Sequence, residues 1–315
     1  MGKIKFGVFL PFYAYQNKDN SPSQQYKIIQ DIALESEKLG YHSIWLDDHL
    51  MYNECTIFES WTVLSALSNL TSKIRLGTMV TCNQHHNPGL LAKTAATLDV
   101  LSNGRLEFGI GAGIQKQEHI AYGFGFPELS TRTERLDEAL SVMTALWTKE
   151  KASYNGKHHT IKDAVCAPKP IQKPYPPITV GGVGEKMLEV TAKYADRFDW
   201  GFLPSKNMYA DKLLSLKKKC EKVGRNYAKI EKSCWPAGQL LLAHNQIELN
   251  KKISIFKPGG VTLEDFKKYT LTATPETCME ELQVYLDLGV SYFMLFFADL
   301  PSMDSLRQFS RVMIN

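Results

Sequence analysis

The sequence predicts an α/β fold in which eight strands, each followed by a helix, close into a (β/α)8 TIM barrel with insertions in the loops at the C-terminal ends of the strands. Apolar runs of strand length alternate with longer segments of helical periodicity, and continuously apolar strands are typical of a parallel sheet covered by helices. Eight such units in 315 residues match a closed barrel, with a doubly wound open sheet as the competing architecture. We therefore expect residues 1–315 to form a single domain.

The predicted strands are short runs of mostly apolar side chains. They span residues 5–10, 43–47, 74–81, 105–113, 177–182, 200–204, 238–244 and 290–298. The predicted helices between them span residues 23–39, 59–71, 88–102, 131–148, 184–195, 209–224, 274–289 and 304–313. The third helix begins with proline, which is tolerated there because the first N–H groups of a helix have no partner within it. Residues 245–274 are poorly patterned, and no element is predicted for them.

Charge and cysteine content narrow the class of protein. The formal net charge is +4, from 37 Lys and Arg against 33 Asp and Glu, which is too small an excess to indicate a nucleic-acid partner. The six cysteines include no CxxC pair, so neither a metal motif nor a disulfide framework is indicated, and a reducing cytoplasm is the expected compartment. No run approaches the roughly 18 apolar residues of a membrane span. We expect a small-molecule partner, and a homodimer as the assembly.

Glycine occupies alternate positions in and after the fourth strand, at Gly109, Gly111 and Gly113. The dinucleotide fingerprint G-x-G-x-x-G would need its third glycine at position 114, which is Ile114. Alternating glycine indicates instead that a flat ligand lies against the backbone. Tight packing within the protein is the alternative interpretation.

A second glycine cluster, "VGGVGEKML", begins at Val180. A strand ends there, glycines follow, and a helix begins at about Glu185. Free N–H groups at a helix start attract anions, so this turn is a candidate phosphate site. A glycine-lined turn without a ligand is the alternative.

Histidines supply the candidate proton-transfer groups. Asp48 and His49 end the second strand, where a histidine can give or take a proton near neutral pH; a purely structural pair is the alternative. The adjacent pairs 85–86 and 158–159 are histidines too. Neighbouring residues point apart and the spacing supplies no third ligand, so no metal site is predicted.

Several stretches of this sequence resemble the luciferase-like family of flavin- and deazaflavin-dependent oxidoreductases, and within it the branch that uses coenzyme F420. The resemblance covers the first two-thirds of the chain nearly without gaps and the final third only through "TPETCMEELQVYLDLGV". The other matching stretches are "FGVFLP", "SIWLDDH", "ESWTVLSALSNLTSKIRLGTMVT", "NPGLLAKTAATLDVLSNGRLEFGIGAG", "EHIAYGFGFP", "RTERLDEAL" and "PKPIQKPYPPITVGGVGEKMLEVTAKYAD".

The resemblance implies a barrel that holds an isoalloxazine-type ring over the strand ends, with a phosphate at the second glycine cluster. It implies a non-proline cis peptide behind the ring at Met79–Val80, and it places His49 at the reacting edge. Catalytic roles are expected for His49, Asp48 and Glu118. The cofactor contacts that the resemblance implies are Met79, Val80, Thr81, Gly111, Gly113, Gln117, Gly181, Gly182, Val183 and Gly184.

One position departs from the sugar-phosphate dehydrogenases of this family. They resemble this chain around Gly113 but carry a glutamate in the next position, where this chain has Ile114. A proton for a substrate carbonyl would then need another donor, and Glu118 or His119 are the nearest candidates. This departure argues against glucose 6-phosphate as the substrate.

The function implied by the resemblance is hydride transfer between coenzyme F420 and an unidentified small organic substrate. An FMN-dependent monooxygenase of the same family is the first alternative, since the shared motifs do not separate the two cofactors. A barrel that binds a flavin without catalysis is the second. Fold alone does not decide between them.

Overall fold

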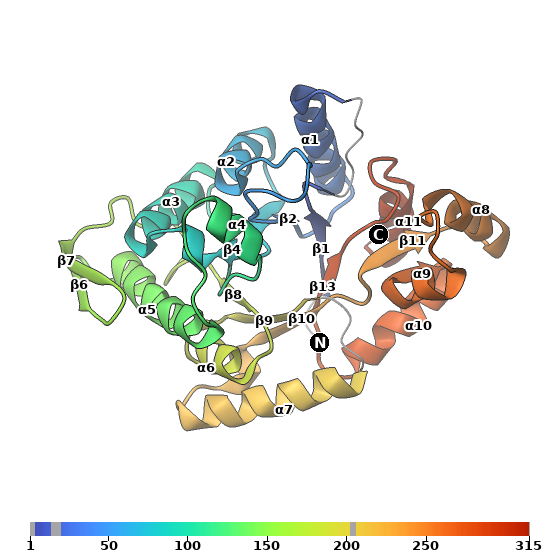
Figure 1. Ribbon diagram of the computed structural model, residues 1–315. Coiled ribbons are helices and arrows are strands. Elements are labelled where there is room, and N and C mark those ends of the chain that lie inside the picture. Colours follow the sequence, from blue (N-terminus) through green and yellow to red (C-terminus); the bar gives the residue numbers. More distant parts are fainter. Residues whose placement is uncertain (1–3, 14–19, 202–205, 315) are drawn as a thin grey trace.

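The computed structural model describes residues 4–13, 20–201 and 206–314, and it confirms the predicted (β/α)8 barrel. Eight parallel strands of the described chain close on one another, because the last strand pairs with the first. They are β1 (Lys5–Leu10), β2 (Ser43–Leu46), β3 (Arg75–Thr78), β5 (Leu106–Gly111), β8 (Ile178–Gly181), β9 (Arg197–Trp200), β10 (Glu231–Cys234) and β13 (Tyr292–Leu295). Figure 1 shows the helices arranged around this central sheet.

The surrounding helices follow the predicted segments closely. They are α1 (Pro22–Lys38), α2 (Ser60–Leu70), α3 (Pro88–Leu101), α5 (Leu129–Thr148), α6 (Glu185–Tyr194), α7 (Lys206–Lys222), α10 (Pro275–Leu286) and α11 (Asp304–Met313). Their first residues show why they begin there. Ser21 and Gln24 form a capping box before α1, and the Asn87 side chain accepts hydrogen bonds from the first turn of α3.

Short elements fill the loops between the barrel units. An antiparallel hairpin of β6 (Ala152–Asn155) and β7 (Thr160–Ala164) projects beyond α5 at the left of Figure 1. Near the strand ends lie β4 (Thr81–Cys82), the 3₁₀ turn η1 (Asn83–His85) and α4 (Lys116–Ala121), and a further 3₁₀ turn, η2 (Tyr227–Lys229), precedes β10. The predicted strand over 74–81 is therefore interrupted after Thr78.

The seventh barrel strand was predicted at residues 238–244, and this assignment is wrong. The seventh strand is β10, whose first two residues, Glu231 and Lys232, are charged, so that it lacks an apolar run. Glu231 is nevertheless accommodated because its carboxylate pairs with Lys5 and Arg197, each at 2.9 Å. An ion-pair network at the end of the barrel thus replaces the apolar side chains by which a barrel strand is usually recognised.

The apolar run at 238–244 belongs to a separate small sheet. There β11 (Gln239–Leu242) pairs in parallel with β12 (Thr270–Ala273). Its side chains are buried because α8 (Gln246–Phe256) and α9 (Leu263–Tyr269) pack on it, with Leu241, Leu249 and Phe266 in one cluster. Figure 1 shows these elements together at the right of the barrel. The stretch 245–274 is thus mostly helical, although its sequence is poorly patterned.

The sixth strand also lies earlier than predicted. It spans Arg197–Trp200 rather than 200–204, and residues 202–204 lie outside the described part of the chain. Because this strand begins with Arg197, it does not appear as an apolar run in the sequence, although the Arg197 side chain is only 3% exposed. Its guanidinium lies 2.9 Å from Glu107 and 4.0 Å from the centre of the Tyr292 ring, so the charge is paired inside the barrel.

Candidate active site

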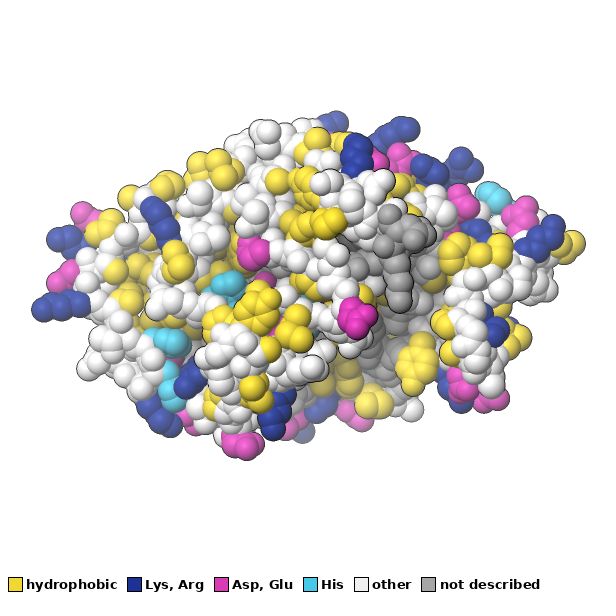
Figure 2. Space-filling view, turned by 45° about the horizontal axis from the view of Figure 1, so that its top comes forward, with side chains coloured by type: hydrophobic (Ala, Val, Ile, Leu, Met, Phe, Trp, Pro, Cys, Tyr) yellow, Lys and Arg dark blue, Asp and Glu magenta, His cyan; other side chains and the backbone are white. Residues whose placement is uncertain are grey.

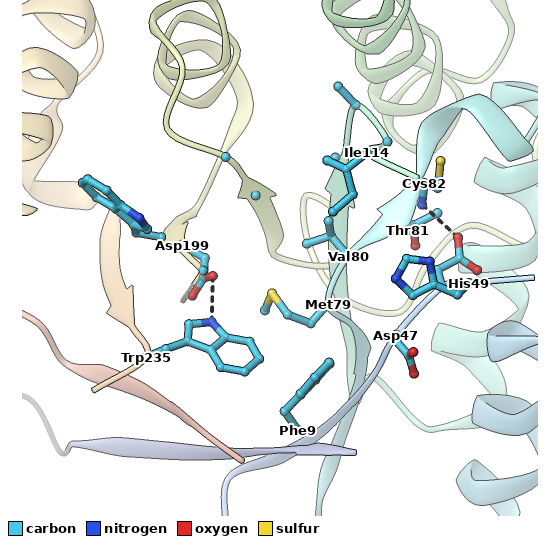
Figure 3. A pocket seen from close by; sticks show the side chains of 18 of the residues that line it. Phe9, Asp47, His49, Met79, Val80, Thr81, Cys82, Ile114, Asp199 and Trp235 are labelled. Carbon is cyan, nitrogen blue, oxygen red and sulfur yellow. Dashed lines mark hydrogen bonds between the residues drawn. The ribbon is translucent and has the colours of Figure 1, made fainter. Parts of the chain in front are cut away.

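A cavity of about 450 Å³ opens at the carboxyl ends of the barrel strands, where barrel enzymes carry their chemistry. Its walls come from the ends of β1, β2, β3, β5, β8, β9 and β10 or from the residues just beyond them. Figure 3 shows the arrangement: His49 faces the cavity from one side, Asp199 and Trp235 face it from the other, and Met79 and Val80 lie between them. The closing of the barrel therefore brings these distant segments around one space.

Most of the predicted site residues lie on this cavity. Those that line it are Asp48, His49, Met79, Val80, Thr81, Gly111, Gly113, Glu118, Gly181, Gly182 and Val183. Gln117 lies elsewhere: it is exposed and lines a neighbouring depression with Tyr52 and Asn53. Glu118, its neighbour on α4, lines both this depression and the main cavity. Gly184 does not line the cavity; it is exposed and precedes α6.

The wall between β3 and β4 contains the expected cis peptide bond, between Met79 and Val80. The Val80 side chain lies close to two glycines. A Cβ added to Gly111 would come within 2.8 Å of Cγ2 of Val80, and one added to Gly181 within 3.0 Å of Cγ1. Glycine at both positions therefore makes room for Val80 at the edge of the cavity.

Lack of space for a side chain also explains why positions 109 and 113 are glycine. A Cβ on Gly109 would meet the carbonyl oxygen of Thr78 at 1.9 Å, and one on Gly113 would lie 2.8 Å from Sγ of Cys82. Packing within the protein, the alternative given above, thus accounts for the three glycines of this strand. Gly111 and Gly113 nevertheless remain on the cavity surface, where a ligand can contact them.

His49 forms an ion pair with Glu118. Its Nδ1 lies 3.1 Å from Oε1 of Glu118, and the backbone N–H of Leu50 donates to Oε2, also at 3.1 Å. Burial opposes the charge of His49, but the hydrogen bond and the negative charge of Glu118 outweigh it and raise the pKa of His49. For Glu118, burial alone would raise the pKa, but the hydrogen bond from His49 and its charge lower it. The pair is therefore ionised more readily than either residue alone.

Asp48 ties two segments of the wall together. Its Oδ2 accepts the backbone N–H of Cys82 at 2.8 Å and lies 3.0 Å from Nε2 of His86. Burial would raise the pKa of Asp48, but the hydrogen bond to His86 and its charge outweigh burial and lower it. Asp48 lines the cavity, and its carboxylate holds the end of β2 against β4.

Asp47, which the sequence analysis did not single out, also lines the cavity. Its Oδ1 accepts the backbone N–H of Phe12 at 2.9 Å, whereas its buried Oδ2 has no hydrogen-bond partner among the described residues. Burial raises the pKa of Asp47 to about 6. The two-residue period of a strand could have indicated this residue, since it places Asp47 and His49 on the same side.

The opposite wall holds a second buried carboxylate that the sequence analysis missed. Asp199 at the end of β9 accepts a hydrogen bond from Nε1 of Trp235 at 3.1 Å and another from the Ser233 hydroxyl. Burial raises the pKa of Asp199. The Trp235 ring packs edge-on against Phe9, with centroids 4.8 Å apart, and forms an apolar floor. This wall could not be predicted because β10, which precedes Trp235, was not recognised.

The second glycine cluster forms the turn between β8 and α6. Gly182 has φ +119°, a conformation that favours glycine, and Gly184 precedes α6 without a side-chain cap. The carboxylate of Glu185, in the first turn, is paired with Lys212 and Lys219 at 3.2 Å each. The first N–H groups of α6 and its positive dipole end are therefore suited to an anion at this corner of the cavity.

Figure 2 shows how side chains of different kinds are distributed over one face of the molecule. There Lys and Arg lie around the periphery, mixed with Asp and Glu, while hydrophobic side chains gather nearer the middle. Among the described residues, none of the helices is both long enough and apolar enough to cross a membrane.

Comparison with known proteins agrees with these features. The family described as luciferase-like monooxygenase matches residues 4–255. The F420-dependent glucose-6-phosphate dehydrogenase of Microbacterium testaceum (strain StLB037) is 27% identical over 284 residues, which cover 82% of this chain and 84% of that protein.

Solved structures share the whole fold at low identity. An F420-dependent secondary alcohol dehydrogenase in complex with an F420–acetone adduct superposes with a TM-score of 0.82 at 21% identity, covering 99% of both chains. The monooxygenase RslO1 from Streptomyces bottropensis superposes with a TM-score of 0.83 at 20% identity, also over 99% of both chains. At such identities the likeness establishes the barrel fold alone.

Proposed function

Because the chain belongs to the luciferase-like monooxygenase family, we propose that it is an F420-dependent oxidoreductase that transfers a hydride between the deazaflavin and a small organic substrate. The observation that carries this proposal is the cavity at the strand ends, with Met79 and Val80 in its wall and the His49–Glu118 pair at its side. The names of the curated relatives support coenzyme F420 over FMN.

The cavity suits such a cofactor in size and chemistry. Its volume of about 450 Å³ lies within the range of about 300–1,000 Å³ of small-molecule sites. The buried Oδ2 of Asp47 lacks a partner among the described residues, and the start of α6 lacks a side-chain cap. We propose that Val80 and Met79 support the ring and that Gly181–Gly184 and the start of α6 hold a phosphate.

When bound, F420 supplies a carbon that gives or accepts hydride, and the protein supplies orientation and proton transfer. Glu118 occupies Nδ1 of His49, which leaves Nε2 as the nitrogen that can meet a ligand in the cavity. We propose that His49 holds or releases a proton there while Glu118 stabilises its charged form. Asp48 fixes the backbone that carries His49, and Asp47 is a further carboxyl on the cavity whose pKa burial raises to about 6.

We propose that the substrate is not a sugar phosphate. At the position where the sugar-phosphate branch carries a glutamate, Ile114 lines the cavity and is 80% exposed. The remaining wall is largely apolar, with Phe9, Trp200 and Trp235. A panel of alcohols, enones and imines, with glucose 6-phosphate included, tests this by absorbance of the bound cofactor. Fast reaction with glucose 6-phosphate alone would contradict it.

Cofactor choice is tested by titration with F420 and with FMN. Trp200 and Trp235 both line the cavity, so a ring bound beside them quenches tryptophan fluorescence. We expect saturable quenching by F420 at lower concentration than by FMN, and weaker quenching in Trp235→Phe. Micromolar binding of FMN without a response to F420 would favour the alternative FMN-dependent monooxygenase. Binding of either cofactor without turnover of any substrate would favour the non-catalytic barrel.

We further propose that the protein acts as a homodimer in the cytoplasm. On α3, Leu90 and Leu101 are 67% and 60% exposed and lie three helical turns apart, on one side of the helix. Such a pair suits contact with a second copy, and the cysteines of the described residues are free, as a reducing compartment allows. Light scattering tests the assembly: a Leu90→Glu variant should be monomeric, and a monomeric wild type would contradict the proposal.

A further inference from the structure

Three side chains that could bind a metal ion meet at the wall of the cavity. Cys82 ends β4, His85 ends η1 and His119 lies in α4. Each offers one ligand atom, and these atoms all lie within 4.8 Å of one another. The sequence analysis predicted no metal site because the spacing of these residues matches no linear motif, but the fold brings α4 back onto η1.

His119 is already oriented as a metal ligand would be. Its Nδ1 lies 2.7 Å from the carbonyl oxygen of Gln115 and therefore carries the proton, which leaves the lone pair on Nε2. Nε2 lies 3.4 Å from Sγ of Cys82. A backbone carbonyl that holds the far nitrogen of a histidine is the usual outer partner in metal sites.

The buried ring of His85 independently indicates that a ligand binds here. Its side chain is 2% exposed, and neither of its buried ring nitrogens has a hydrogen-bond partner among the described residues. The nearest carboxylate oxygen, Oε1 of Glu118, lies 3.9 Å from Nε2, beyond hydrogen-bond distance. The ring is packed between His119 and Phe124, with centroids 4.6 and 5.0 Å away. Burying an imidazole without partners is costly, and a metal ion would satisfy it.

We propose that Cys82, His85 and His119 form a binding site for a divalent transition-metal ion of borderline softness, such as Zn²⁺. One thiolate and two imidazoles are a donor set that Zn²⁺ prefers. Tetrahedral geometry, with Zn–S of about 2.3 Å and Zn–N of about 2.0–2.1 Å, requires a sulfur–nitrogen separation of about 3.5 Å. The Cys82–His119 separation of 3.4 Å meets this requirement, and a small movement of the His85 ring completes the set.

The fourth coordination position can face the cavity. Cys82 and Glu118 both line the cavity, which provides an access route for the ion. On binding, the Cys82 thiol releases its proton, and the thiolate and the two neutral imidazoles coordinate the ion. The bound ion ties α4 to η1 and β4, and it thereby holds Glu118, the neighbour of His119, against His49. This role is independent of which cofactor and substrate the cavity takes.

The test is a metal titration of the full chain, first stripped with a chelator. Zn²⁺ is titrated against a chromophoric chelator, and Co²⁺ is added in a parallel experiment, because a bound thiolate gives an intense Co²⁺ charge-transfer absorption. The variants are Cys82→Ser, His85→Gln and His119→Gln. Two variants serve as matched controls: Cys166→Ser, since Cys166 is also buried, and His159→Gln, since His159 also has a buried nitrogen without a partner.

We expect one Zn²⁺ per chain and a thiolate–Co²⁺ absorption, with weaker Zn²⁺ binding in all three ligand variants, loss of the absorption in Cys82→Ser, and neither change in the controls. Affinity should fall at least about tenfold per ligand, the lower end of what loss of even an outer partner costs. Wild type without the Co²⁺ absorption, or Zn²⁺ affinity that Cys82→Ser leaves unchanged, would overturn the proposal. The wild-type Co²⁺ spectrum decides the question even if a variant fails to fold, and neither result depends on F420 binding.

Discussion

Nδ1 of His49 lies 3.1 Å from Oε1 of Glu118, so that two residues 69 positions apart in the chain form one ion pair at the side of the cavity. The partner carboxylate comes from α4, which lies in the loop after β5, and the histidine follows β2. Substitution of either His49 or Glu118 therefore changes the charge at the same place beside the cavity. This relationship underlies the first prediction.

His49→Asn should lower turnover more than cofactor affinity, because a proton-transfer group contributes about 10²–10⁴-fold in rate. Glu118→Gln keeps the length of the side chain but removes its charge, so we expect a smaller loss of turnover and a lower pKa of His49 by NMR. Stopped-flow reaction of bound cofactor with the substrate panel measures the rate. His42→Asn, at the opposite end of the barrel beside Glu107, is the control. Wild-type rates in His49→Asn with every reactive substrate would show that His49 is structural.

Asp47→Asn should change how stability depends on pH. Burial raises the pKa of Asp47 from 3.8 to about 6, so the folded protein binds more protons than the unfolded chain between these values. Its contribution to stability is therefore present below pH 3.8 and is lost as the pH rises to about 6. Asparagine cannot ionise and keeps the oxygen that accepts the Phe12 N–H. The melting temperature of the variant relative to wild type should therefore be higher at pH 7.5 than at pH 4.5; an equal difference at both would contradict this assignment.

Gly182→Asp should abolish cofactor binding while the fold is kept. Like charges held close together in a poorly solvated corner repel strongly, and the substituted carboxylate would lie where the phosphate is proposed to bind. Gly182 has φ +119°, so any side chain strains this turn. Gly182→Asn, which has the same shape without the charge, is therefore the matched control. Titration of both variants with F420, alongside circular dichroism, measures the effect. Equal affinity in the two variants would mean that the turn holds no anion.

Gly111→Ala should destabilise the protein, and Val80→Ala should reverse much of that loss. The new methyl group would lie 2.8 Å from Cγ2 of Val80, and overpacking of this kind costs about 1–3 kcal/mol. Removing the Val80 methyl groups relieves the clash, so the double variant should be more stable than the sum of the two single changes predicts. Urea unfolding of the four proteins measures the coupling. Strict additivity would show that Gly111 does not serve to accommodate Val80.

The sequence by itself determined the features that depend on local periodicity. Alternation of apolar strands with helices gave the barrel, since such strands are stable only when helices cover them. The glycine turn before α6 and the position of His49 at a strand end could also be predicted, because each depends on residues adjacent in the chain. Strands that contain charged residues could not be predicted from apolar periodicity. In β9 and β10, Arg197 and Glu231 replace apolar side chains, and their charges are accommodated because they pair with each other and with Glu107 and Lys5.

Only the tertiary structure decided which side chains meet. The loop after β5 returns toward the end of β2, and this return, which no periodicity encodes, places Glu118 on His49 and His119 on Cys82. The tertiary structure also brings the backbone N–H of Cys82 to 2.8 Å from the Asp48 carboxylate, so that Asp48 joins the end of β2 to β4. Contacts between loops are set by closure of the whole barrel, so the spacing of residues along the chain carries no direct record of them.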